Sequence, residues 1–407
     1  MKRGARRRAA LAVRNGICAL LAHWSLLARW ALLAHWSLAA LCVFPGPALA
    51  ERPEALAGAF RAAEGSREWR FPRDHGSHED YRLEWWYYTG LLTAEDGGRI
   101  GFQVTFFRRA VLPGPVWRAS AWAPRSLFAA QAALSLLGEG RFMREGLAAR
   151  GSLGMAGAAT DRQEVWLGAW RAEALPGDPH GVRLHVPGRE FALDLELRAE
   201  REPVLHGVDG LDRKGEARGN ASWYYSLTRL AAKGRVIVDG KARAVRGMAW
   251  MDHEFGTTQL AAENAGWDWM GLRLSDGSDL MLYRLRRKDG APSPHSAGTW
   301  VDPNGRSVAF TLAPGSGNRL TPLRWWQSPA TGARYPIAWR IELPELDVEL
   351  TVEPLLEAQE LAPTPGIPFA YWEGAVSVKG RRGRRAVRGE GYLELTGYGG
   401  SLDPVLR

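Results

Sequence analysis

The sequence predicts an all-β protein built from two tandem β-barrels, and three observations support this fold class. From residue 81 onward, short runs of alternating apolar and polar residues are separated by Gly, Asn-Gly, Asp-Gly and Pro, which is typical of antiparallel sheet. Hairpin turns are expected at 93–98, 238–241, 274–279 and 302–307. The two halves of the chain also carry similar markers in the same order. A chain of 407 residues is long enough for two such domains.

Residues 1–50 predict an export signal. A basic start, "MKRGARRR", is followed by an Ala/Leu/Trp-rich segment and by "GPALA" before Glu51, so cleavage is expected after Ala50. The mature protein would then be periplasmic or secreted. His23, Arg29 and His35 interrupt the apolar segment, which leaves no clean span of about 18 apolar residues. An uncleaved membrane anchor is the alternative.

Removal of this segment changes the charge and the cysteine content. Lys plus Arg falls by seven, from 53 to 46, while Asp plus Glu stays at 44, so the mature net charge is about +2. Nucleic-acid binding therefore has little support. Cys18 and Cys42 are both removed, so we expect no disulfide, no thiolate nucleophile and no Cys-bound metal. No cofactor and no metal are predicted.

Two pairs of similar segments indicate an internal duplication. "AVRGMAWMD" at 244–252 matches "AVRGEGYLE" at 386–394. Aromatic residues precede an Asp-Gly turn in both halves, with the second segment one residue shorter; they are Trp86 and Tyr88 in the first half and Trp267 and Trp269 in the second. The repeat spans roughly 79–255 and 262–398, and we expect domains at 51–255 and 256–407. Chance similarity between hairpins is the alternative.

The stretch "VRGMAWMDHEFG" provides the main candidate site. In a strand, alternation places Trp250, Asp252 and Glu254 on one face and His253 on the other. Contact with Trp and Met removes water from a carboxyl group and raises its pKa, so Asp252 could act as a general acid. The alternative is that Asp252 and Glu254 lie at a strand end, paired with Arg246 or with solvent.

Aromatic residues are expected to line the pocket around this acid. In "SWYYSLTRL", Trp223 and Tyr225 share a face, which would create a lining suited to a long apolar ligand with a reactive end. Protonation of an alkene creates a carbocation, which facing aromatic rings stabilise. The candidate ligand contacts are Trp86, Tyr88, Trp223, Tyr225, Trp250, Trp267 and Trp269. Ordinary core packing is the alternative for the tryptophans.

A second polar group lies in "FPRDHGSHEDYRLEWWYYTG", residues 71–90. His75 and His78, with Glu84 nearby, offer nitrogen and oxygen atoms that a metal could use. Because Gly76 and Ser77 indicate a loop, hydrogen bonds that tie the loop to the barrel mouth are the preferred interpretation. Glu84 directly precedes a Trp pair at a strand start and is a further candidate catalytic carboxylate.

These stretches resemble the secreted two-domain lipocalin-like family that includes the carotenoid 1,2-hydratases and the AttH-type proteins, often labelled predicted secreted hydrolases. The resemblance rests on residues 71–90, "NASWYYSLTRL", "GMAWMDHEFGTTQL", "GWDWMGLRLSDGSDLMLYRLR" and "YWEGAV...GEGYLELTGY". It implies two lipocalin-like domains and assigns the hydratases' acid to Asp252. The chain departs from the hydratase pattern at Trp223 and Trp250, and from many relatives at Gln131. No G-x-S-x-G motif supports a serine hydrolase.

Two functions follow from these observations. The first is an exported, cofactor-independent enzyme that acts on a hydrophobic isoprenoid or acyl substrate, with Asp252 as its acid. The second is a non-catalytic periplasmic lipid-binding protein that serves an ABC-type transporter. Contact with a membrane is compatible with both functions but required by neither.

Overall fold

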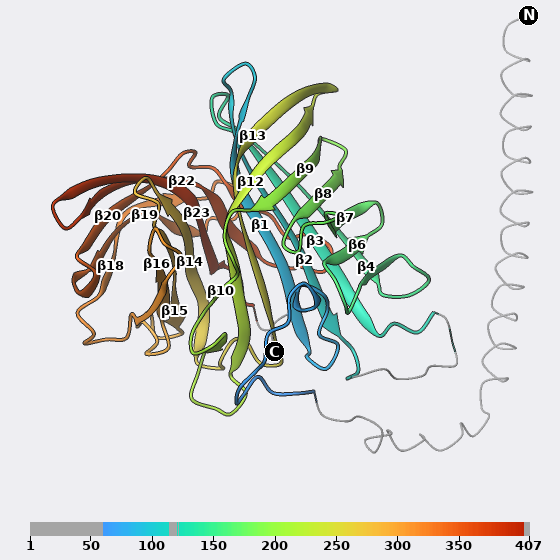
Figure 1. The fold of residues 1–407 in the computed structure, drawn as a ribbon, viewed down its shortest axis with the longest axis horizontal. Coiled ribbons are helices and arrows are strands. Elements are labelled where there is room, and N and C mark those ends of the chain that lie inside the picture. Colours follow the sequence, from blue (N-terminus) through green and yellow to red (C-terminus); the bar gives the residue numbers. More distant parts are fainter. Residues whose placement is uncertain (1–59, 114–119, 121, 403–407) are drawn as a thin grey trace, which may run out of the picture. The chain divides into compact units, whose positions relative to one another are not determined.

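The computed structural model describes residues 60–113, 120 and 122–402. The predicted export signal and both cysteines lie outside the described residues. Residues 58–407 form one compact unit. It is made of β-strands and two short 3-10 helices, η1 (Arg73–His75) and η2 (Pro344–Leu346), and Figure 1 shows the strands gathered in two curved layers. No helix in the described part of the chain has the length and apolar character needed to span a membrane.

Within the described residues, the first sheet has thirteen antiparallel strands. Their order is β4-β3-β2-β1-β13-β12-β9-β8-β7-β6-β5, and β10 and β11 pair with β12 beside this path. The strands are β1 (Leu83–Ala94), β2 (Arg99–Ala110), β3 (Ser126–Leu136), β4 (Arg141–Arg150), β5 (Ala156–Ala158), β6 (Glu164–Leu167), β7 (Trp170–Ala174), β8 (Val182–Pro187), β9 (Phe191–Ala199), β10 (Val204–Leu205), β11 (Leu211–Arg213), β12 (Ala221–Val238) and β13 (Lys241–Gly256).

The second sheet has ten strands in the same part of the chain. Their order is β17-β16-β15-β14-β23-β22-β20-β19-β18, and β21 pairs with β22. The strands are β14 (Asn264–Leu274), β15 (Asp279–Arg287), β16 (Ala297–Val301), β17 (Ser307–Thr311), β18 (Arg319–Gln327), β19 (Arg334–Leu343), β20 (Val348–Pro354), β21 (Glu360–Leu361), β22 (Ala370–Arg382) and β23 (Arg385–Gly399).

Both sheets have the same topology. In each sheet, the first four strands form a meander, the first strand of the meander pairs with the last strand of the sheet, and that last strand pairs with its predecessor in the sequence. In the first sheet the meander is β1 to β4, followed by β13 and β12. In the second sheet it is β14 to β17, followed by β23 and β22. Beyond β12 the first sheet continues through β9, β8, β7, β6 and β5, whereas beyond β22 the second sheet continues through β20, β19 and β18, so the first sheet has two more strands at this edge. The prediction of two tandem barrel-like domains is confirmed.

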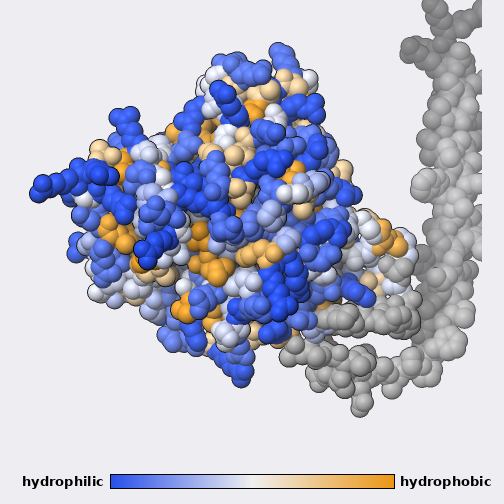
Figure 2. Space-filling view, in the orientation of Figure 1, coloured by the Kyte–Doolittle hydropathy of each residue, from blue (hydrophilic) through white to orange (hydrophobic). Residues whose placement is uncertain are grey.

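Each curved sheet encloses an apolar core of its own. Trp86, Tyr88 and Phe102 lie in the first core, and Trp339 and Trp372 lie in the second. Strand alternation supplies these side chains, as in β9, where buried and half-buried residues alternate. On the face drawn in Figure 2, hydrophilic residues predominate and apolar residues form small separate patches.

The strand register corrects one detail of the predicted repeat. Tyr87 pairs with Asp252, and Trp269 pairs with Glu394, the residue that matches Asp252 in the second copy. Trp269 therefore corresponds to Tyr87 and not to Tyr88. A shift of one residue reverses the face of a strand. Trp86 and Tyr88 are consequently inside the first barrel, whereas Trp267 and Trp269 contribute to clusters outside the second core.

Candidate functional site

Strand β13 carries polar groups on both of its faces. Trp250, Asp252 and Glu254 share one face of the strand, and this face points away from the core of the first barrel toward the second sheet rather than into a barrel. His253 points into the first barrel, where its ring stacks on Trp86 with ring centroids 4.9 Å apart. The strand therefore connects two distinct polar sites, one on each face of the sheet.

The outward face of β13 lines a cavity between the two sheets. The space open to the centre of a water molecule measures about 110 Å³, enough for roughly seven to ten waters or for the reactive end of an organic ligand. The lining is largely aromatic, with four carboxyl groups. Its residues are Trp85, Tyr87, Thr105, Phe107, Lys214, Tyr224, Asp252, Glu254, Gln259, Trp267, Trp269, Tyr283, Leu285, Gly366, Ile367, Phe369, Tyr371, Glu373, Glu394 and Thr396.

Asp252 is held in place by three hydrogen-bond donors. The Tyr224 hydroxyl donates to Oδ2 at 2.6 Å, Trp250 Nε1 donates to Oδ1 at 2.6 Å, and the Ser226 hydroxyl also donates to Oδ1. Burial nevertheless raises the pKa of Asp252 to about 7, because desolvation outweighs these donors and Glu254 adds like charge. No described residue forms an ion pair with Asp252. A carboxyl group in this environment can hold or release a proton near neutral pH.

Glu254 lies in a different environment within the same cavity. Lys214 Nζ is 3.1 Å from Glu254 Oε1 and 2.7 Å from Asp212 Oδ2, and Ser222 donates to Glu254 Oε1 at 2.5 Å. Burial raises the pKa of Glu254 in spite of the lysine. Glu254 therefore belongs to an ion-paired network, in contrast to Asp252.

The opposite wall of the cavity contributes a second pair of carboxyl groups. Glu373 and Glu394 are direct neighbours on β22 and β23. Burial raises the pKa of Glu394 to about 8, and burial together with Glu394 raises the pKa of Glu373 well above its usual range. Among the described residues, no partner meets hydrogen-bond geometry at either carboxyl oxygen of Glu373 or at the hydroxyl of Tyr87, although the Tyr87 and Tyr371 hydroxyls lie close enough to act on the pKa of Glu373. Such buried, unpartnered groups mark a place where a ligand could bind.

A loop of the second sheet packs against the first sheet beside the cavity. Tyr371 donates to Gln131 Oε1 at 2.6 Å, and Gln131 Nε2 donates to Thr364 Oγ1 at 2.7 Å. At Gly146, an added Cβ would come within 2.6 Å of Thr364, so only glycine permits this contact. Gln131 thus joins the two sheets.

The expectation that Trp223 and Tyr225 share a face with Asp252 is wrong. Across β12 and β13, Tyr225 pairs with His253, and Ser226 pairs with Asp252. Trp223 and Tyr225 therefore lie on the His253 face, and Tyr224 and Ser226 contact Asp252 instead. β12 and β13 form one hairpin, and a β-bulge between Leu227 and Leu230 shifts their register by one residue. This shift decides which aromatic residue faces the acid, and alternation within one strand does not reveal it.

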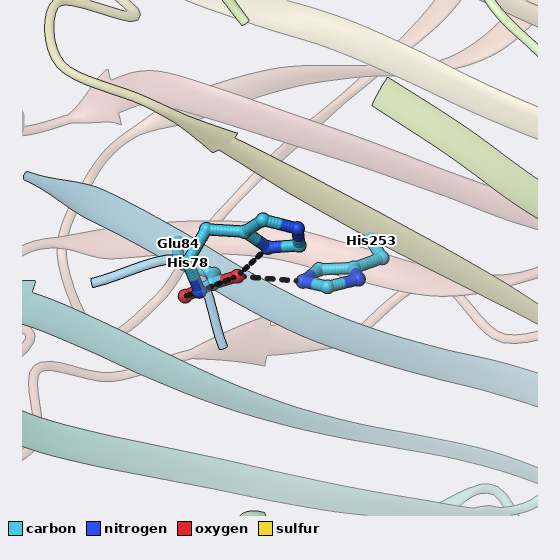
Figure 3. A group of neighbouring side chains, drawn as sticks. All are labelled: His78, Glu84 and His253. Atoms are coloured by element: carbon cyan, nitrogen blue, oxygen red, sulfur yellow. Dashed lines mark hydrogen bonds and ion pairs between the residues drawn. The ribbon is translucent and has the colours of Figure 1, made fainter. Parts of the chain in front are cut away.

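The inward face of β13 belongs to a network centred on Glu84 (Figure 3). Glu84 Oε1 lies 2.9 Å from both His78 Nδ1 and His253 Nε2, and Arg108 Nε donates to Glu84 Oε2 at 2.8 Å. Burial opposes ionisation, but Arg108 and the two histidines hold the pKa of Glu84 well below its usual range. Glu84 is therefore an ionised hub and a poor proton donor at neutral pH.

Among the described residues, His78, Glu84 and His253 form a group whose side chains could bind a metal ion. Their nitrogen and oxygen atoms lie within 4.8 Å of one another. Arg108 already neutralises Glu84, and both histidines already bond to it, so the residues fit a hydrogen-bonded hub better than a dicationic metal. His75 lies outside this group and contacts the Tyr225 hydroxyl through Nδ1 at 2.6 Å.

Comparison with known proteins places the chain in a family. The model of the AttH-like family matches residues 62–398. A structure from Nitrosomonas europaea assigned as AttH is 34% identical, with a TM-score of 0.74, and the match covers 83% of this chain and 99% of that one. Kievitone hydratase from Nectria haematococca shares the fold, with a TM-score of 0.60 and 16% identity over 78% and 89% of the two chains.

A curated relative is more distant. A dehydratase of Emericella nidulans is 22% identical over 225 residues, which are 53% of this chain, and the match spans only 60% of the dehydratase. The match to the family model extends across both sheets and includes all four carboxyl groups of the cavity. The chain therefore belongs to the AttH-like family.

Proposed function

We propose that this protein adds water to, or removes water from, a hydrophobic substrate held in the cavity between the two sheets, with Asp252 as general acid. The observation that carries the proposal is the state of Asp252, which is buried among aromatic rings, has no ion-pair partner among the described residues and has a pKa raised to about 7. The family relationship supports a hydratase-like reaction, because a hydratase and a dehydratase are among the similar proteins.

The reaction uses one proton and one water. Asp252 gives its proton to one carbon of an alkene, and the π-electron pair forms the new C–H bond. Water then attacks the resulting cation, forms the C–O bond and releases a proton to solvent, while the Asp252 carboxylate takes up a proton from solvent. The reverse sequence eliminates water from a tertiary alcohol. The rings of Trp85, Trp269 and Tyr224 line the same cavity and would stabilise the cation through their π faces.

The carboxyl pair across the cavity supplies a complementary group. Both oxygens of Glu373 are buried and have no partner in hydrogen-bond geometry in the described part of the chain, so the group can form hydrogen bonds with a water or a hydroxyl group. Proximity to Glu394 disfavours ionisation of both groups, so the pair retains a proton more readily than either residue alone. In this account Glu373 binds the attacking water.

The substrate is longer than the cavity. An open apolar groove shares Trp85, Phe107 and Gly366 with the cavity and continues over Leu127, Ala129 and Ala148. Its open space, about 480 Å³, exceeds that of the cavity, about 110 Å³. We propose an isoprenoid or acyl substrate whose reactive end enters the cavity while its chain lies in the groove. The groove also favours the alternative of a non-catalytic lipid carrier, exported by residues 1–50 and associated with an ABC-type transporter.

Analysis of a bound ligand separates the two functions. The protein is isolated from its own host, and native mass spectrometry followed by extraction identifies the apolar molecule that it carries. The ligand is then incubated with wild type, with Asp252→Asn and with Asp161→Asn, which changes an exposed carboxyl group. The enzyme reading predicts gain or loss of the mass of water with wild type and Asp161→Asn only. An unchanged ligand in all three, or conversion by Asp252→Asn at the wild-type rate, would contradict it.

A further inference from the structure

Asp252 is connected to a hydrogen-bonded path that leads away from the cavity. The Ser226 hydroxyl, which donates to Asp252 Oδ1, lies 2.6 Å from His206 Nε2. On the other side of the imidazole ring, His206 Nδ1 lies 2.9 Å from Thr299 Oγ1. Three elements that are distant in sequence therefore converge: β12 supplies Ser226, the segment after β10 supplies His206, and β16 of the second sheet supplies Thr299.

The path ends at Thr299, which is itself buried and lies at the base of a surface groove. Thr299 is among the residues that line a surface groove, together with Leu205, Gly207 and Asn304. Ser226 and His206 are fully buried. The path therefore crosses the interior between the acid and a face of the molecule that is separate from the cavity and from the apolar groove beside it.

We infer that Ser226, His206 and Thr299 form a proton relay that exchanges the proton of Asp252 with solvent while a substrate fills the cavity. This inference rests on the proposed function, because only an acid that loses its proton in each reaction needs a supply that bypasses the substrate. Ser226 contacts Asp252, His206 contacts Ser226, and Thr299 contacts His206, while none of the three lines the cavity. They therefore act by positioning and replacing the proton of Asp252.

The donor and acceptor pattern fits this role. With Asp252 ionised, the Thr299 hydroxyl donates to His206 Nδ1, Nε2–H donates to Ser226, and Ser226 donates to Asp252. When the proton is on Asp252 Oδ1, every bond in the chain reverses, and the His206 proton moves to Nδ1. Both states keep all the hydrogen bonds of the chain, since hydroxyl groups and neutral imidazole can each donate and accept.

The other partners of Asp252 do not share this property. Trp250 carries an N–H that can only donate. Tyr224 accepts a hydrogen bond from Trp269 Nε1 at 3.0 Å, and its own proton has no acceptor other than Asp252 among the described contacts. Ser226 is therefore the partner through which a proton can pass.

Burial keeps the relay histidine neutral. Desolvation, with a smaller contribution from Lys214, lowers the pKa of His206 to about 3. The ring therefore changes its tautomer without becoming an imidazolium. Several other charged or titratable groups face His206 and Asp252, and the variants proposed below leave all of them unchanged. They are Lys214 and Asp212 beside β11, Tyr224 on β12, Glu254 on β13, Tyr283 on β15 and Glu394 on β23.

Nitrogen-15 NMR of histidine-labelled protein tests the relay without any substrate. In wild type we expect His206 to be the Nδ1–H tautomer at about pH 5 and the Nε2–H tautomer at about pH 8, neutral at both. In Asp252→Asn, which has nothing to titrate, one tautomer should persist across this range. Asp161→Asn should behave as wild type. A wild-type His206 that keeps one tautomer at both pH values, or that becomes doubly protonated, would overturn the inference.

A kinetic test with the ligand found above separates this inference from the proposed function. If His206→Ala lowers kcat about 100-fold, the lower range for a positioned proton-transfer group, with KM unchanged and with recovery on addition of imidazole, the relay is supported. Ser226→Thr should keep most of the activity because it keeps the hydroxyl, whereas Ser226→Ala should not. Full activity in folded His206→Ala, while Asp252→Asn is inactive, would overturn the relay and leave the proposed function intact.

Discussion

Replacement of Asp252 by Asn should change the pH dependence of stability in a defined direction. At a pH below about 4, Asp252 is protonated in both the folded and the unfolded chain. Between about pH 4 and pH 7 the unfolded chain releases this proton while the folded protein keeps it, so wild type loses stability as the pH rises. Above that range both states are ionised and the loss is complete. Asn does not titrate and avoids the loss.

The magnitude follows from the shift in pKa. Burial moves the pKa of Asp252 from 3.8 to about 7, so the lost stability is about 4 kcal/mol for a fully buried group. The free energy of unfolding of Asp252→Asn, relative to wild type, should therefore increase by about this amount between pH 4 and pH 8. Any fixed penalty for the amide, such as a poorer bond with Tyr224, cancels in this comparison of two pH values.

Urea unfolding followed by tryptophan fluorescence measures this difference across the pH range. Asp161, exposed and paired with exposed Arg162, is the matched control, and Asp161→Asn should show little pH-dependent difference from wild type. A difference between Asp252→Asn and wild type that stays constant with pH, or that shrinks as the pH rises, would refute the argument that Asp252 is a neutral acid near pH 7.

Three further predictions follow from the two faces of the first sheet. Trp250→Phe removes an N–H donor from the Asp252 carboxylate and should raise the pKa of Asp252 by about one unit, which infrared titration of the protonated carboxyl band can measure; a lower pKa would contradict this. Arg108→Met leaves Glu84 buried without its cation and should destabilise the protein by about 3 to 5 kcal/mol in urea unfolding at neutral pH; a loss below 1 kcal/mol would show that the histidines suffice. Glu373→Gln removes a carboxyl group whose pKa is raised, so the variant should gain stability relative to wild type between pH 5 and pH 8, and an unchanged difference would argue against the shared proton.

Much of the fold could be predicted from the sequence, because β-alternation and turn residues are local signals. The matched segments at 244–252 and 386–394 identified the duplication, and the two sheets repeat one topology. The same local alternation predicted that Trp250, Asp252 and Glu254 share a face. The description of the site was weaker wherever it depended on strand pairing.

The residues that sequence reasoning missed reach the site through a β-bulge in the β12–β13 hairpin and through pairing between distant segments. Tyr224 and Ser226 face Asp252 because of the β12–β13 register, and His206 reaches Ser226 from a short segment that pairs beside β12. Glu373 enters the cavity from the second sheet, where it neighbours Glu394. The repeated sequence already matches Asp252 with Glu394. Pairing Glu394 with the preceding strand, β22, would have identified Glu373 as its neighbour. The packing of two outward sheet faces against each other has no local signal.

The most direct test of the central claim is incorporation of oxygen from water. Two isoprenoid alkenes, farnesol and geranylgeraniol, are first tested for binding and are then incubated with wild type and with Asp252→Asn in water enriched in oxygen-18, and the products are examined by mass spectrometry. The account predicts one labelled hydroxyl group per product molecule with wild type and only background label with Asp252→Asn. Equal labelling by Asp252→Asn, or no labelling by wild type of an alkene that it binds, would contradict the account.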